Sequence, residues 1–327
     1  MAEHAAADDF DDDIFIYRGG RAPQHVFHVL IDKSVDEIED HAFRFCENLL
    51  TVETHDGLRR LGKYAFHRCR SLRRINLKSA VKIDEYAFYK CENLESVEFG
   101  DRLEIIGRNV FSYCTSLELK HLRLPSILAI GISAFLECTR MTDVELSEQL
   151  ERIGSSSFYG CERLQRIAIP LKRNLFEYSF QFNKYIQFVK CDQLTTVELV
   201  GQAHKQTVAS LHMESWRAEI ISEINRINQV LPNTPANEKA EEIRQWMNSV
   251  IDKMDHYKAG HYRYVKEGIT LLELALWKAK LDEKEEYTAA GKPKKAKIDE
   301  ERARKDKRMT CGADMVINNV LPFLQLE

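Results

Sequence analysis

The sequence predicts an α+β fold, in which a curved solenoid of parallel β-strands is followed by an α-helical C-terminal region. Three observations predict it. A block of the form Ala-Phe-x-x-Cys-x-x-Leu recurs through the first 200 residues, a short strand signal follows each block, and the apolar spacing changes to three and four residues beyond Gly201. A unit of 22–24 residues cannot bury its own apolar edge, so successive units are expected to stack on one continuous core.

The phenylalanines of the blocks set the repeat period. In the first six copies the cysteine follows the phenylalanine by three residues. In the seventh copy Cys191 follows Phe180 by eleven residues, so we expect an eight-residue insertion between them. A spacing of 22 to 24 residues predicts about seven repeats over residues 25–200, carrying Phe43, Phe66, Phe88, Phe111, Phe135, Phe158 and Phe180.

A strand signal and a glycine complete each repeat. Alternating apolar residues such as Ile75 and Leu77 predict strands with one buried face and one wet face. Leu-Gly or Ile-Gly pairs then end in Gly62, Gly107 and Gly154, where we expect a turn with positive φ.

Together these features resemble the BspA-type leucine-rich repeats, over roughly residues 25–199. The resemblance implies a curved leucine-rich-repeat solenoid used for protein binding, with no catalysis. The segment from Gly268 to Trp277 is similar to segments of diatom members, which suggests intracellular diatom or protist relatives.

The outward-facing strand residues are the candidate partner-binding site on the concave sheet. Their signs alternate, so Glu98, Arg123 and Glu145 are expected to form cross-strand pairs. Two interpretations remain open: the charges recognise a protein, or they compensate one another and only keep the sheet soluble. A nucleic acid would favour one sign and exposed aromatic rings, which argues against that partner. The candidate residues are Glu53, Arg74, Asn76, Glu98, His121, Arg123, Asp143, Glu145, Arg166 and Glu198.

Seven of the eight cysteines belong to the repeat, and Cys311 lies outside it. A redox or metal-binding stack is one interpretation. However, metal sites favour close pairs such as Cys-x-x-Cys, and the sequence contains none. We therefore expect buried, inert thiols and no metal or cofactor.

The two ends of the solenoid need caps, because a terminal unit exposes its apolar edge. Residues 1–24 read as an acidic segment and the start of a capping hairpin between Phe15–Tyr17 and Val26–Ile31. The helical region 205–290 carries three apolar stripes, with a break expected at Gly260. It either caps the solenoid or forms a coiled coil that binds a partner or makes a homo-oligomer.

The C-terminal segment is a basic linker over 291–310 and a short apolar tail over 311–327. The linker has two interpretations, a nuclear-import signal or a solvated connection. The import residues would be Lys292, Lys294, Lys295, Lys297, Arg302, Arg304 and Lys305.

Composition narrows the function classes further. The formal charge is −4, and no apolar run approaches the 18 residues of a bilayer span. The acidic start of the chain lacks the basic and then apolar order of a secretory signal, so we expect an intracellular, cytoplasmic protein. It would be nuclear if the basic linker acts as an import signal. No phosphate loop, zinc motif or nucleophile elbow occurs, so we expect no enzyme but a protein-interaction module. The alternative is a structural protein that self-associates through its C-terminal helices.

Overall fold

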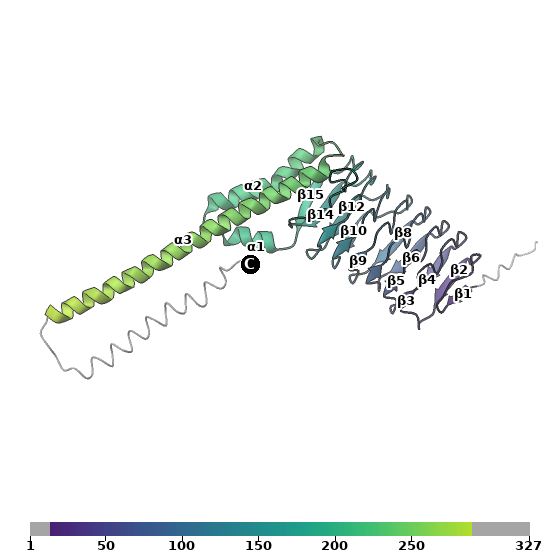
Figure 1. Ribbon diagram of the computed structural model, residues 1–327, viewed down its shortest axis with the longest axis horizontal. Helices are drawn as coiled ribbons and strands as arrows, with labels where there is room; N and C mark the ends of the chain where they lie inside the picture. The colour runs from purple at the N-terminus through teal and green to yellow at the C-terminus, as the bar shows by residue number, and fades with distance from the viewer. Residues whose placement is uncertain (1–13, 290–327) are drawn as a thin grey trace, which may run out of the picture. The chain divides into compact units, whose positions relative to one another are not determined.

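The structure, a computed structural model, describes residues 14–289 (Figure 1). The predictions for the acidic residues before Ile14, the basic linker and the apolar tail therefore lie outside the described residues. The chain divides into one unit of Met1–Ser210 with Ser215–Lys253, and a second of Leu211–Glu214 with Met254–Glu327. The predicted solenoid is the main part of the first unit, in which all strand pairs between named strands are parallel.

The longer strands form two sheets along one side of the solenoid. Because each strand begins one full turn after its predecessor, neighbouring strands run in the same direction. The five-stranded sheet contains β1 (Ile14–Tyr17), β2 (His28–Ile31), β4 (Thr51–Glu53), β6 (Arg74–Leu77) and β8 (Ser96–Phe99). The four-stranded sheet contains β10 (Leu122–Leu124), β12 (Asp143–Leu146), β14 (Arg166–Pro170) and β15 (Thr196–Val200).

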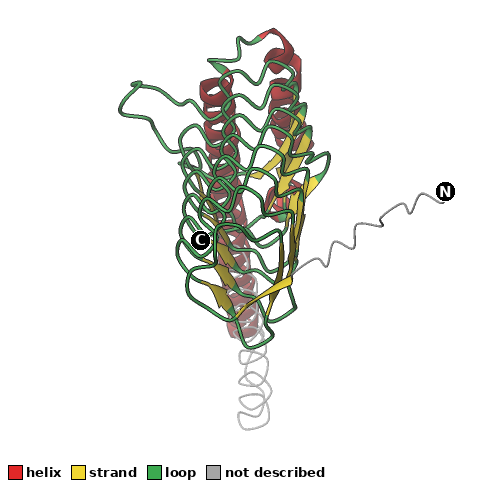
Figure 2. Cartoon of the chain, turned by 90° about the vertical axis from the view of Figure 1, so that its right-hand side faces the viewer, coloured by secondary structure: helices red, strands yellow, loops and turns green. Residues whose placement is uncertain are grey.

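A third sheet of two-residue strands lies on another side of the solenoid (Figure 2). The second residue of each of these strands is apolar. In the repeats that carry the glycine, this residue stands directly before it. Its members are β3 (Glu37–Ile38), β5 (Arg60–Leu61), β7 (Lys82–Ile83), β9 (Ile105–Ile106), β11 (Ala129–Ile130) and β13 (Arg152–Ile153).

A column of stacked phenylalanine rings runs through the core. The ring centroids of Phe43 and Phe66 lie 5.0 Å apart, and those of Phe158 and Phe188 lie 5.8 Å apart. The prediction for the seventh repeat is therefore wrong. Phe188 occupies the core position, three residues before Cys191, while Phe180 is 91% exposed. The inserted residues therefore lie before the Phe-x-x-Cys motif and not within it. The three-residue spacing from phenylalanine to cysteine is kept because it fits the tight turn that every unit shares.

The repeat glycines serve close packing between units, which corrects the expected positive φ. A Cβ on Gly154 would lie 2.4 Å from the backbone nitrogen of Ile132, so the backbones of the two units approach too closely for a side chain. Left-handed backbone occurs instead on either side of the phenylalanine, as at Tyr64 and Arg68 around Phe66.

The N-terminal strands do not form the predicted hairpin. Strands β1 and β2 pair in parallel, with Ile14 opposite His28. The connection over 18–27 crosses the end of the core, where the Ala22 N–H donates to the Ala42 carbonyl at 2.8 Å. It is a shortened turn of the solenoid, and the tilted ring of Tyr17 packs against Phe43 at a centroid distance of 4.9 Å, in place of a preceding phenylalanine.

The helices are α1 (Ala203–Ser210), α2 (Glu214–Val230), the 3-10 helix η1 (Leu231–Asn233) and α3 (Lys239–Ala289). Helix α2 ends directly before η1, which contains Pro232. The break expected at Gly260 is wrong, because α3 is continuous; a glycine costs about 1 kcal/mol in a helix but does not break it.

Within the first unit, α2 and the start of α3 cover the last turn of the solenoid. The side-chain oxygen of Asn228 accepts a hydrogen bond from the Val197 N–H of β15 at 2.8 Å. Trp246 is fully buried and donates to the Glu223 carbonyl at 2.9 Å. These contacts make residues up to Lys253 a cap, which is one of the two interpretations left open by the sequence.

Candidate partner-binding surface

We call the outward side of the long strands β4, β6, β8, β10, β12, β14 and β15, together with the residue before each, the strand face. All ten candidate residues lie on it, with His121 directly before β10. Asp143, Glu145 and Arg166 are half-buried, and the other seven are exposed. Strand register brings Asp143 opposite Arg166, and Arg123 opposite Glu145.

Arg166 is the centre of an ion-pair network across three strands. Its Nη1 lies 2.7 Å from Asp143 Oδ1, and its Nη2 lies 2.6 Å from Glu198 Oε2. The hydrogen bond that Arg166 donates to Glu198 raises the pKa of Arg166 and lowers the pKa of Glu198. The guanidinium is therefore held charged and in one orientation.

A hollow of about 560 Å³ opens beside this network. The second oxygen of Asp143 lies 3.9 Å from His121 Nδ1 at its wall. The other wall residues carry hydroxyl or amide groups, which both donate and accept hydrogen bonds. The lining residues are His121, Thr142, Asp143, Gln165, Arg166, Gln193, Thr195 and Thr196.

Sequence reasoning missed four of the hydroxyl and amide residues of this hollow, Thr142, Gln165, Gln193 and Thr195. Thr142, Gln165 and Thr195 each stand immediately before a long strand, at the same repeat position. The signal was present in the repeat, since extending the outward positions by one residue would have found all three.

The predicted cross-strand pairs form only in part. Arg123 Nη2 lies 3.0 Å from Glu145 Oε1, as expected. Glu98 instead pairs with Lys78 at 2.7 Å, because β8 and β10 belong to different sheets. Arg74 and Glu53 make no ion pair with any side chain described, so the charges of the face are not all compensated among these residues.

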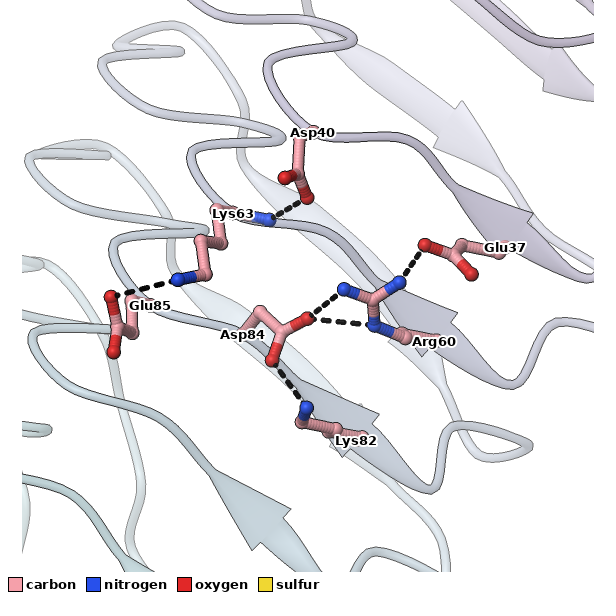
Figure 3. Close-up of polar contacts among 7 residues, drawn as sticks. All are labelled: Glu37, Asp40, Arg60, Lys63, Lys82, Asp84 and Glu85. Carbon is pink, nitrogen blue, oxygen red and sulfur yellow. Dashed lines mark hydrogen bonds and ion pairs between the residues drawn. The ribbon is translucent and has the colours of Figure 1, made fainter.

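A second polar cluster connects units on the six-stranded sheet and serves as a contrast. Figure 3 shows Arg60 and Lys82 directed at Asp84, whose side chain is 8% exposed. Arg60 also bonds Glu37. Burial alone would lower the pKa of Arg60, but its hydrogen bond with Asp84 raises it overall. With its carboxylates engaged by cations, this cluster joins neighbouring units.

The repeat cysteines are buried free thiols, as predicted. Each Sγ from Cys69 onward donates to the carbonyl oxygen of the phenylalanine one unit earlier, as from Cys191 to Phe158 at 3.0 Å. Burial raises the pKa of Cys46 to about 11 and that of Cys191 to about 12, so both are thiols at neutral pH. Within the described residues, no group of three or more His, Cys, Asp or Glu is placed to hold a metal ion.

Comparisons with solved structures find leucine-rich-repeat proteins. A leucine-rich repeat protein of T. pallidum is 23% identical, with 62% of this chain and 88% of that chain covered, at a TM-score of 0.37. A leucine-rich repeat protein of Bacteroides ovatus is 24% identical, with 54% and 55% covered, at a TM-score of 0.35. No match was found among curated proteins. Among the helices of residues 14–289, none combines the length and apolar character of a bilayer span.

The repeat sequence itself identifies the family. Six copies of the pattern described as "BspA type Leucine rich repeat region" match over residues 25–126 and 116–203, more than half of the chain. The matched residues are those that build the phenylalanine column, the buried thiols and the strand face. The chain therefore belongs to the BspA-type leucine-rich-repeat family.

Proposed function

We propose that this chain is a protein-binding module or scaffold that holds its partner on the strand face and performs no catalysis. The observation that carries the proposal is the hollow around Arg166, where a charged group fixed by Asp143 and Glu198 is surrounded by hydroxyl and amide groups. Leucine-rich repeats are a general type of protein-interaction module, and solenoids offer extended surfaces for binding.

The geometry favours recognition over proton transfer. Asp143 and Glu198 both accept hydrogen bonds from Arg166. The bond to Glu198 lowers the pKa of Glu198, and its carboxylate is therefore a poor general acid near neutral pH. Side chains that are already oriented lose little conformational freedom when a partner binds. The expected partner is a protein segment that presents both donors and acceptors to the hollow.

The test uses the partner recovered by affinity purification from native cells and then purified. Arg123→Glu and Arg166→Gln are expected to weaken its binding by on the order of tenfold each. Glutamine is chosen at 166 because a glutamate there would add a third carboxylate beside Asp143 and Glu198. Arg152→Glu, on the six-stranded sheet, is the matched control and should bind normally. Unchanged binding by both strand-face variants, with unchanged melting temperatures, would remove the proposal.

A structural role through the C-terminal helices is the second candidate, and one observation favours it. In the second unit, α3 leaves large apolar side chains in solvent, with Leu271 at 66% and Trp277 at 67% exposed. Such a surface favours contact with another protein surface. If two copies meet there, Leu272→Glu in the full chain will lower the average mass that sedimentation equilibrium measures, because the dimer dissociates. An unchanged average mass excludes this role for α3.

A further inference from the structure

A ladder of aromatic rings lies on the early turns of the solenoid, beside the phenylalanine column. Two residues before the core phenylalanines stand His41, Tyr64 and Tyr86, whose rings stack at centroid distances of 4.9 Å from one unit to the next. One residue after the core phenylalanines, His67 stacks on Tyr89 at 5.2 Å. We call the ring and cation side chains of 41–45, 64–68 and 86–90, apart from the core phenylalanines, the turn patch.

Three cations of the turn patch lie over its rings. The guanidinium carbons of Arg44 and Arg68 are 4.8 and 5.7 Å from the ring centroid of Phe45. The ammonium nitrogen of Lys90 is 5.6 Å from that of Tyr89. Within the described part of the chain, none of the three cations pairs with a carboxylate, and the Nε atoms of both arginines are buried without a hydrogen-bond partner. A guanidinium carries five N–H donors, so the turn patch has donors to offer to a ligand.

The carboxylates on either side of these turns are held by two other basic residues of the same units. Lys63 holds Asp40 through its backbone N–H and Glu85 through its ammonium group, and Arg70 holds Glu47 and Glu92. The positive charge of the turn patch is therefore not neutralised by these neighbours.

His67 lies within the resulting positive potential. It is 7% exposed, and its Nδ1 has no hydrogen-bond partner among the described residues. Burial is the main cause that lowers the pKa of His67, and the charges of Arg44, Arg68 and His41 lower it further. These three neighbours are cationic or become so on protonation, so the electrostatic potential at this point favours an anion.

Later turns share the backbone of the turn patch but not its side chains. Glu137 takes the place of Arg68, and Ser133 takes the place of Tyr64, with a positive φ at all four positions. The turn therefore requires neither a ring nor a cation. The collection of rings and cations on successive early turns is a property of this surface and not of the fold.

We propose that the turn patch binds an acidic protein segment, which lays aspartate or glutamate side chains along the row from Arg44 to Lys90. A guanidinium and a carboxylate match as bidentate hydrogen-bond partners. Same-side residues of an extended segment recur about every 6.6 Å, so its carboxylates would meet the cations of successive units. The proposal does not depend on which partner the strand face binds.

A single-stranded nucleic acid fits the turn patch less well. Its bases need free ring faces on which to stack. The two faces of Tyr64 are covered by His41 and Tyr86, whose rings are tilted from it by only 6° and 4°. The ladder therefore presents ring edges, which carry partial positive charge and attract carboxylate oxygens.

Fluorescence anisotropy of a labelled peptide of ten aspartates, titrated with the full chain, tests the binding. We expect an affinity that falls as salt is added, because the contact is ionic. Arg44→Gln combined with Arg68→Gln should raise the dissociation constant by on the order of tenfold. The matched control, Arg59→Gln combined with Arg152→Gln, removes the same charge at two exposed positions and should bind like the parent. Equal affinities of the two double variants would overturn the proposal, as would a parent chain that does not bind.

The strand face and the basic linker carry positive charge as well, so each needs its own control. Arg166→Gln tests the strand face, and glutamine in place of the four lysines of 291–300 tests the linker. Both should retain more affinity for the peptide than the variant of Arg44 and Arg68. A larger loss in either control would place the peptide on that surface and refute the proposal.

Imidazole resonances locate the peptide on the parent chain, so this measurement does not depend on the folding of a variant. Saturation with the peptide should shift the resonances of His41 and His67 and leave that of His121, on the strand face, in place. Unchanged resonances of His41 and His67 would contradict the proposal. Tighter binding of a ten-nucleotide oligouridylate than of the peptide would assign the turn patch to nucleic acid instead.

Discussion

The ammonium group of Lys239 donates a hydrogen bond to the carbonyl oxygen of Leu194 at 2.7 Å. It also donates to the carbonyls of Cys191 at 3.0 Å and Asp192 at 2.9 Å, and the residue is 2% exposed. Burial lowers the pKa of Lys239. In earlier turns the next repeat covers the loop that begins at the repeat cysteine. At the last turn no further repeat follows, and Lys239 of α3 supplies hydrogen-bond donors to the carbonyls of this loop.

Lys239→Met should therefore destabilise the first unit by about 3 kcal/mol, because the carbonyls of Leu194 and Asp192 lose this donor, while the Cys191 carbonyl keeps the Leu194 N–H. Urea unfolding followed by circular dichroism measures the loss. Lys205→Met, at an exposed position of α1, is the control and should change the free energy of unfolding by less than about 0.5 kcal/mol. Equal effects of the two variants would show that Lys239 does not cap the solenoid.

Two phenylalanines of the seventh repeat should differ sharply. Phe188→Ala opens a cavity beside Phe158 and should cost about 3 to 5 kcal/mol of unfolding free energy. Phe180→Ala removes a side chain that is 91% exposed and should cost almost nothing. Thermal unfolding of both variants compares them directly. A larger loss for Phe180→Ala would restore the register expected from the sequence.

Two glycines should respond with opposite sign to alanine. Gly154→Ala would force a Cβ to within 2.4 Å of the Ile132 backbone nitrogen, so we expect a loss of about 1 to 3 kcal/mol. Gly268 lies in α3 with open space around it, and alanine there should stabilise the helix by up to about 1 kcal/mol. Helix content on heating reports the second change. A neutral Gly154→Ala would contradict the close approach between units.

His67 should make stability fall at acidic pH. Burial, with Arg44 and Arg68 nearby, lowers its pKa to about 4. Between pH 6.5 and about 4 the unfolded chain binds a proton that the folded chain does not, so this group contributes stability above 6.5 that is lost as the pH falls.

His67→Tyr removes the titration while keeping a ring that can stack on Tyr89, now 5.2 Å from the histidine ring. Urea unfolding at pH 7 and pH 5 should show a smaller acid loss in this variant than in the parent chain. His25→Tyr, at an exposed position, controls for removal of a histidine. An acid loss as large in His67→Tyr as in the parent would assign the effect to other groups.

The periodic pattern predicted the interior well because each core position recurs at a fixed distance from its phenylalanine. Phe66, Cys69 and Leu72 are all fully buried, as their spacing indicates. The pattern failed where the period was interrupted. Around Phe180 two phenylalanines competed for one position, and only the three-residue distance to Cys191 decides in favour of Phe188.

The candidate surface was predictable as a set of outward positions, but not as a site. Alternation places Asp143 and Arg166 on the same face, yet the diagonal bond from Arg166 to Glu198 depends on the register of β14 with β15. The charges of Arg74 and Arg166 look alike in the sequence. In the structure one has no ion pair within the described residues, and the other has two.

By itself the sequence determined the repeat family, the parallel strands, the buried thiols and the outward polar positions, because these follow from a period that every unit repeats. Tertiary structure decided how the ends are completed, since an end has no neighbour to copy. Whether β1 turns back as a hairpin or continues the solenoid, and which residue covers the last carbonyls, depends on contacts between distant parts of the chain such as Tyr17 with Phe43 and Lys239 with Leu194. Such contacts leave no periodic trace in the sequence.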